Sequence, residues 1–125
     1  MIIFAWIYIV LTVVVAVFQL ALIFGAPLGE YTLGGRYPGK LPTNLRLAAV
    51  VQIAILIFFA VIVMARSGLA FSEYDNLGRI GIWFVVAFFV LGTVMNLSSP
   101  SKKEKVVMGP LNVMALASTA IIALA

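Results

Sequence analysis

The side chains that most often carry enzyme chemistry are scarce in this chain. Histidine and cysteine are absent, and the only acidic residues are Glu30, Glu73, Asp75 and Glu104. Without histidine, the usual proton shuttle and metal ligand is missing. Without cysteine, there is no thiol nucleophile and no disulfide. We therefore expect a protein that is not an enzyme and that uses no metal and no cofactor.

One stretch resembles a phosphate-binding motif. Residues 34–40 read G-G-R-Y-P-G-K, which matches the G-x-x-x-x-G-K core of a P-loop. A P-loop requires Ser or Thr next, for magnesium, and a helix behind it. Leu41 and Pro42 stand there instead, which argues against nucleotide hydrolysis. The stretch instead predicts a glycine-rich loop whose Arg36 and Lys40 contact an anionic lipid headgroup, or a lid packed between helices. Glu30, Arg36 and Lys40 are candidate ligand-binding residues of this loop.

The next most informative polar side chains are four amides, each within a long apolar stretch: Gln19, Gln52, Asn96 and Asn112. Two interpretations compete. The amides, with Thr93, can hydrogen-bond across helices and fix their packing, at about 0.6 kcal/mol each. Alternatively they line a cavity that binds a polar head or a small solute. The sequence favours packing, but these amides are also its candidate ligand-binding residues.

The amides belong to four runs that contain no charged residue, at 2–24, 47–65, 80–97 and 106–125. A helix rises 1.5 Å per residue and the hydrocarbon layer is about 30 Å thick, so each run can just span a bilayer. In lipid such a segment must be helical to satisfy its own backbone. With 65% hydrophobic and 10% charged residues in 125, the chain is predicted to be all-α. We expect one domain, residues 1–125, that forms an integral membrane four-helix bundle.

Glycine, proline and capping residues predict where these helices end. The G-A-P sequence at 25–27 should stop the first helix. Thr43 or Asn44 should cap the second helix, and the third should begin close to Arg79. Residues 98–105 should form a charged turn, with Gly109 and Pro110 in or just after the first turn of the last helix. We call the connecting segments that follow the first, second and third helices the first, second and third loops.

Basic residues predict the orientation in the membrane. Six of the eight lie on the side of the first and third loops: Arg36, Lys40, Arg46, Lys102, Lys103 and Lys105. Because short basic loops stay in the cytoplasm, both termini and the second loop should lie outside. The net charge of +4 then favours anionic lipid over nucleic acid, with Lys102, Lys103 and Lys105 at the headgroups. The aromatic residues expected at the outer boundary are Trp6, Tyr8, Tyr74 and Trp83.

Several short motifs pair the first loop with the third: Gly25-Ala26-Pro27-x-Gly29, Gly34-Gly35, Leu41-Pro42, Asn96-x-x-Ser99-x-Ser101-x-x-Glu104 and Gly109-Pro110. In these motifs the chain resembles a family of small four-helix bacterial integral membrane proteins of unassigned function. The resemblance implies residence in the bacterial plasma (inner) membrane. It also implies a joint role for the two loops, with an Arg36–Glu104 contact as one link between them.

Three functions stay open. The first is a non-enzymatic bundle that binds a lipid or small amphiphile in a polar layer on the cytoplasmic side, alone or as a homo-oligomer. The second is an accessory or structural subunit of a larger membrane complex. The third is a small transporter or channel for a neutral or anionic solute. A proton-coupled carrier is disfavoured, because such carriers normally need an acid within the membrane and Gln19 cannot titrate.

Overall fold

Four long helices follow from the four apolar runs. The computed structural model describes residues 2–125, with helices α1 (Ile2–Ile23), α2 (Thr43–Ser67), α3 (Asp75–Leu97) and α4 (Lys102–Leu124). Three single 3₁₀ turns lie in the loops, η1 (Gly29–Tyr31), η2 (Leu33–Gly35) and η3 (Ser72–Tyr74). All four long helices are long and apolar enough to cross a membrane. The all-α four-helix prediction is confirmed, and the chain is a multi-pass membrane protein.

Helices α2, α3 and α4 begin earlier than their apolar runs, and three expected boundaries are wrong. The N-cap of α2 is Pro42 rather than Thr43 or Asn44, and no side chain caps it. The Pro42 carbonyl accepts hydrogen bonds from the amides of Leu45 and Arg46, both at 3.0 Å, which starts the helix. Helix α3 begins at Asp75, one turn before Arg79, and these two residues form an ion pair at 2.9 Å.

Helix α4 also starts earlier than expected, so residues 98–105 are not all turn. Ser101 is the N-cap, and its Oγ accepts a hydrogen bond from the Glu104 amide at 3.3 Å. This cap places Lys102–Lys105 in the first helical turn and shortens the third loop to 98–101. Pro110 lies inside the helix, beyond its first turn.

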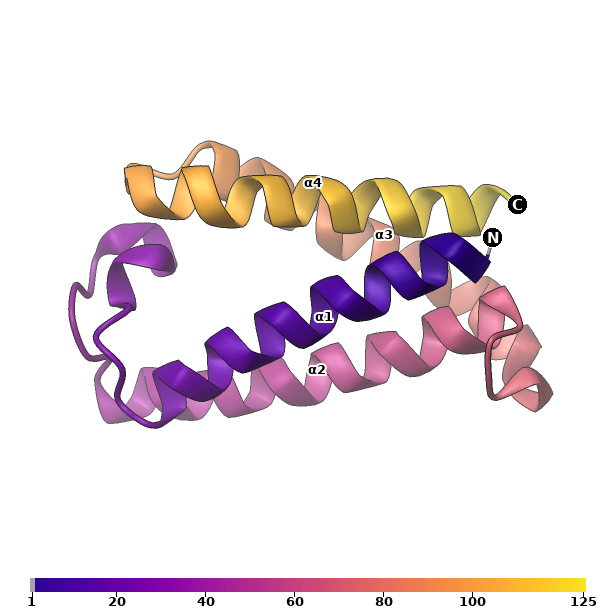
Figure 1. Ribbon diagram of the computed structural model, residues 1–125, viewed down its shortest axis with the longest axis horizontal. Helices are drawn as coiled ribbons and strands as arrows, with labels where there is room; N and C mark the ends of the chain where they lie inside the picture. Colours follow the sequence, from indigo (N-terminus) through magenta and orange to yellow (C-terminus); the bar gives the residue numbers. More distant parts are fainter. Residues whose placement is uncertain (1) are drawn as a thin grey trace.

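The bundle is tight at one end and open at the other. Each helix packs against its neighbours in the chain, and α1 closes the ring against α4. Figure 1 shows both termini at one end, where α1 and α4 lie close, and the two helices diverging towards the first loop. The packed core occupies the end near the termini, where its fully buried members include Ala5, Tyr8, Val63, Ile82, Val85 and Ile122. The other half of the bundle is therefore less filled by its own side chains.

Small residues allow the close packing at the tight end. A Cβ atom at Gly78 of α3 would lie 2.9 Å from the backbone nitrogen of Arg66 in α2. A Cβ at Gly81, one turn on, would lie 3.1 Å from Cδ1 of Ile62. These glycines let α2 and α3 approach closely, as small residues do in membrane helix packing.

Candidate functional site

A cavity of about 760 Å³ lies between the helices in the open half of the bundle. All four helices contribute to its walls, which are mostly apolar in the middle and include Leu11, Val15, Leu56, Phe88 and Ala115. Its volume is in the range of small-molecule sites in proteins, about 300–1,000 Å³. The packed core fills the half near the termini, so the cavity is closed at that end.

The four candidate amides, one from each helix, all line this cavity: Gln19, Gln52, Asn96 and Asn112. Among the described residues, none of them hydrogen-bonds to another helix. Asn112 Nδ2 donates to the Met108 carbonyl of its own helix, at 3.1 Å. The expected bonds across helices are therefore not formed within residues 2–125, and the amides leave hydrogen-bonding capacity beside the cavity. Their role in binding a ligand stays a prediction.

Thr93 was expected in the same polar layer but does not line the cavity. Its Oγ1 is buried, with no hydrogen-bond partner within the part of the chain that the structure describes.

The first and third loops form the open end of the cavity. Its lining there includes Thr32, Arg36 and Tyr37 of the first loop and Ser99 of the third. Arg36 and Tyr37 are exposed, so the cavity reaches the surface at this end. The turn η1 packs against α4, which places the first loop across the side on which α1 and α4 diverge (Figure 1).

Glu104 joins the two loops from the start of α4. Its side chain is buried, and its Oε2 accepts hydrogen bonds from the Gly34 amide at 2.8 Å and from Ser99 Oγ at 3.0 Å. The expected Arg36–Glu104 contact is wrong, since no ion pair links these side chains among the residues described. A backbone amide takes the place of the guanidinium, and Gly34 presents it from a left-handed conformation, with φ of 69°.

Two further contacts tie the loops together. Lys103 Nζ lies 2.8 Å from Glu30 Oε2 in an exposed ion pair, and Ser101 Oγ donates a hydrogen bond to the Glu30 carbonyl. A Cβ at Gly35 would lie 2.8 Å from the Ser101 Cβ, which shows how closely the backbones approach. These contacts join the glycines of the first-loop motifs to the serines of the third-loop motif.

Some predicted site residues lie away from the cavity. Glu30 and Lys40 do not line it, whereas Arg36 does. Lys102, Lys103 and Lys105 are exposed at the start of α4, so their contact with lipid headgroups stays a prediction.

Arg46 caps α1, because its Nε and Nη2 donate to the Ile23 carbonyl at 2.8 and 2.6 Å.

Tyr8 is a lining residue that the sequence reasoning missed. It was expected at the outer membrane boundary, but it is fully buried and packs edge to face on Phe89, with ring centroids 5.7 Å apart. Its helical spacing could have revealed this position. Tyr8, Thr12, Val15 and Gln19 are three or four residues apart and therefore share one face of α1.

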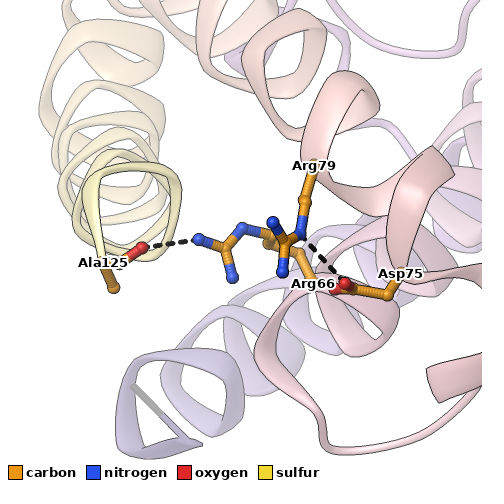
Figure 2. A network of polar contacts seen from close by, with 4 residues as sticks. All are labelled: Arg66, Asp75, Arg79 and Ala125. Carbon is orange, nitrogen blue, oxygen red and sulfur yellow. Dashed lines mark hydrogen bonds and ion pairs between the residues drawn. The ribbon is translucent and has the colours of Figure 1, made fainter.

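The opposite end of the bundle carries a separate polar cluster, shown in Figure 2. Arg66 Nη2 donates to the Ala125 carbonyl at 2.6 Å, which ties α2 to the end of α4. Arg79 pairs with Asp75 on α3. These contacts are exposed and lie at the far end from the cavity mouth, so we assign them to helix termini rather than to the site.

The fold and the cavity define this chain as a multi-pass membrane helix bundle with an internal cavity open at one end. No family model, curated protein or solved structure matches it. The cavity and the residues around it are therefore what bears on function.

Proposed function

We propose that this protein is a non-enzymatic binding protein that holds a single-chain lipid or another small amphiphile in its cavity. The observation that carries the proposal is that one amide from each helix lines a single cavity, and within residues 2–125 none of the four bonds to another helix. Each amide is half-buried and lines the cavity, so its unused hydrogen-bonding groups can bind a polar head. The apolar middle of the cavity suits a hydrocarbon chain.

The charge at the mouth favours an anionic head. Arg36 lines the cavity and is exposed, whereas the Glu104 carboxylate already accepts two hydrogen bonds from the protein. A guanidinium binds carboxylate and phosphate well, because its planar donors match their oxygens. The head would thus sit between Arg36 and the amides, with its chain directed towards the packed core.

The closed end of the cavity supports binding over conduction. In the half of the bundle near the termini, Tyr8, Val63, Ile82, Val85 and Ile122 are fully buried and in contact as one core. A solute path through the bundle would have to displace this core. We therefore expect liposomes that contain the protein to show no solute flux above that of empty vesicles.

Replacing two of the amides tests the proposal. Gln19→Leu together with Asn112→Leu should lower the affinity for dodecanoate about 30-fold, at about 1 kcal/mol for each hydrogen bond lost. Affinity is measured by titration calorimetry on protein in lipid nanodiscs, alongside mass spectrometry of co-purified lipid. The matched control is Asn44→Leu with Asn76→Leu, two exposed amides outside the cavity, which should bind as wild type. Equal binding by both double variants would remove the cavity from the proposal.

The proposed orientation places the first and third loops, and so the cavity mouth, on the cytoplasmic side of a bacterial inner membrane. Because the chain has no cysteine, single cysteines report it cleanly. Ser72→Cys in the second loop and Pro38→Cys in the first both replace exposed residues. We expect a membrane-impermeant maleimide to label Ser72→Cys on intact cells and Pro38→Cys only after permeabilisation. The reverse pattern would place the mouth outside.

A further inference from the structure

One polar atom near the closed end of the cavity has no hydrogen-bond partner among the described residues. Tyr8 is fully buried and lines the cavity, and its hydroxyl has no hydrogen-bond partner within residues 2–125. Thr12 lies one turn along α1 and also lines the cavity, and its hydroxyl is close to that of Tyr8. The two hydroxyls do not meet the geometry of a hydrogen bond. Buried hydroxyls are normally paired, so an orphaned one beside a cavity points to a group that the cavity receives.

The side chains that pack with Tyr8 in the core are apolar. Its ring packs on Phe89, and Leu11 and Phe88 belong to the same apolar cluster and also line the cavity. These side chains carry no polar atom, so they offer the phenol nothing to bond with. The phenol oxygen shares its lone pairs with the ring and is a better donor than acceptor, which makes the missing partner a hydrogen-bond acceptor.

The position of Tyr8 sets where that acceptor must lie in the ligand. Tyr8 and Gln19 are on the same face of α1, about 16 Å apart at 1.5 Å per residue. Between them the walls are apolar, apart from Thr12. A ligand whose head reaches the amides would therefore bring its tail, not its middle, to the phenol.

We propose that the preferred ligand is a single-chain amphiphile that carries an acceptor oxygen, a carbonyl or an ether, at its tail end, and that Tyr8 donates a hydrogen bond to it. This inference rests on the proposed function, because it assumes that an amphiphile occupies the cavity. It adds a specificity-determining residue that reads the far end of the ligand. The amides would hold the head, and Tyr8 would distinguish functionalised tails from plain hydrocarbon.

Three probes of equal chain length test the inference: dodecanoate, 11-oxododecanoate and 6-oxododecanoate. The two keto acids have the same polarity and differ only in where the carbonyl lies. Affinities are measured on wild type and Tyr8→Phe in lipid nanodiscs. Wild type should bind the 11-oxo acid about fivefold more tightly than the 6-oxo acid, the factor that one net hydrogen bond supplies. Tyr8→Phe should abolish that preference.

The outcomes separate this inference from the proposed function. If dodecanoate binds but wild type does not distinguish the two keto acids, the role of Tyr8 is wrong and the binding function stands. If none of the three probes binds, both fail. A preference that persists in Tyr8→Phe would also overturn the inference. Because the comparison of keto acids in wild type needs no variant, the test holds even if Tyr8→Phe were unstable.

Discussion

Replacing Gly29 by alanine is expected to open the first loop. The added Cβ would lie 1.8 Å from the Tyr37 carbonyl oxygen and 2.7 Å from that of Gly39, which are backbone atoms that no rotamer change can move. The substitution would also break the hydrogen bond from the Gly29 amide to the Gly39 carbonyl, now 2.9 Å. We expect the free energy of opening this loop to fall by about 3 kcal/mol, as for other substitutions that force backbone clashes.

Proteolysis measures this opening directly, because trypsin can cleave at Arg36 and Lys40 within the same loop. A loss of about 3 kcal/mol raises the open population, and hence the cleavage rate, about a hundredfold. The control is Gly39→Ala, since nothing lies within 4 Å of its Cβ and only its φ of 79° is unfavourable. That control should cost about 1–2 kcal/mol. If both variants were cleaved at one rate, the contact between Gly29 and Tyr37 would not hold the loop.

Glu104→Ala is expected to have the second-largest effect, by separating the first loop from the start of α4. The side chain is 7% exposed and accepts hydrogen bonds from the Gly34 amide and Ser99 Oγ. Its loss leaves both donors without that acceptor. We expect the free energy of unfolding to fall by about 2–3 kcal/mol, the range for hydrogen bonds to a buried charged group. The midpoint of thermal unfolding in one fixed detergent measures the change.

Two further variants show which contact is responsible for the loss of stability. Glu104→Gln keeps an acceptor oxygen and should lose less than Glu104→Ala. Lys103→Ala removes the neighbouring ion pair with Glu30, which is exposed on both sides and should contribute less than about 1 kcal/mol. An equal loss in Lys103→Ala and Glu104→Ala would show that surface charge, not the buried carboxylate, joins the loops.

The helices were predictable because lipid leaves the backbone few choices. Any uncharged run that spans the hydrocarbon layer must satisfy its own amides, so the number of helices and their approximate positions followed from where charges are absent. Their first residues did not follow. Those depend on single atoms, such as the Pro42 carbonyl that starts α2 and the Ser101 hydroxyl that starts α4.

The candidate site was predictable in part. The positions of Gln19, Gln52, Asn96 and Asn112 in their helices place them at one depth, and the structure brings all four to one cavity. Whether they bond across helices or face a space depends on how far the helices diverge, which local sequence does not determine. The prediction for Tyr8 was wrong because Tyr8 lies on the same face of α1 as Gln19, and its burial there outweighs the preference of tyrosine for membrane boundaries.

The first loop was the least predictable part. Gly34, Gly35 and Gly39 all have positive φ, so a large range of turns was open to this segment until its contacts with α4 were known. The expected link between side chains, Arg36 to Glu104, was wrong because the loop offers its backbone instead of a side chain.

That backbone contact has a consequence for sequence drift. On the side of the first loop, the partners of Glu104 and Ser101 are the Gly34 amide and the Glu30 carbonyl, which every non-proline residue possesses. Substitutions at side chains such as Arg36 and Tyr37 would therefore leave the contacts between the loops intact while altering the entrance that these side chains line. The selectivity of the entrance can thus change during evolution while the contacts that join the two loops are kept.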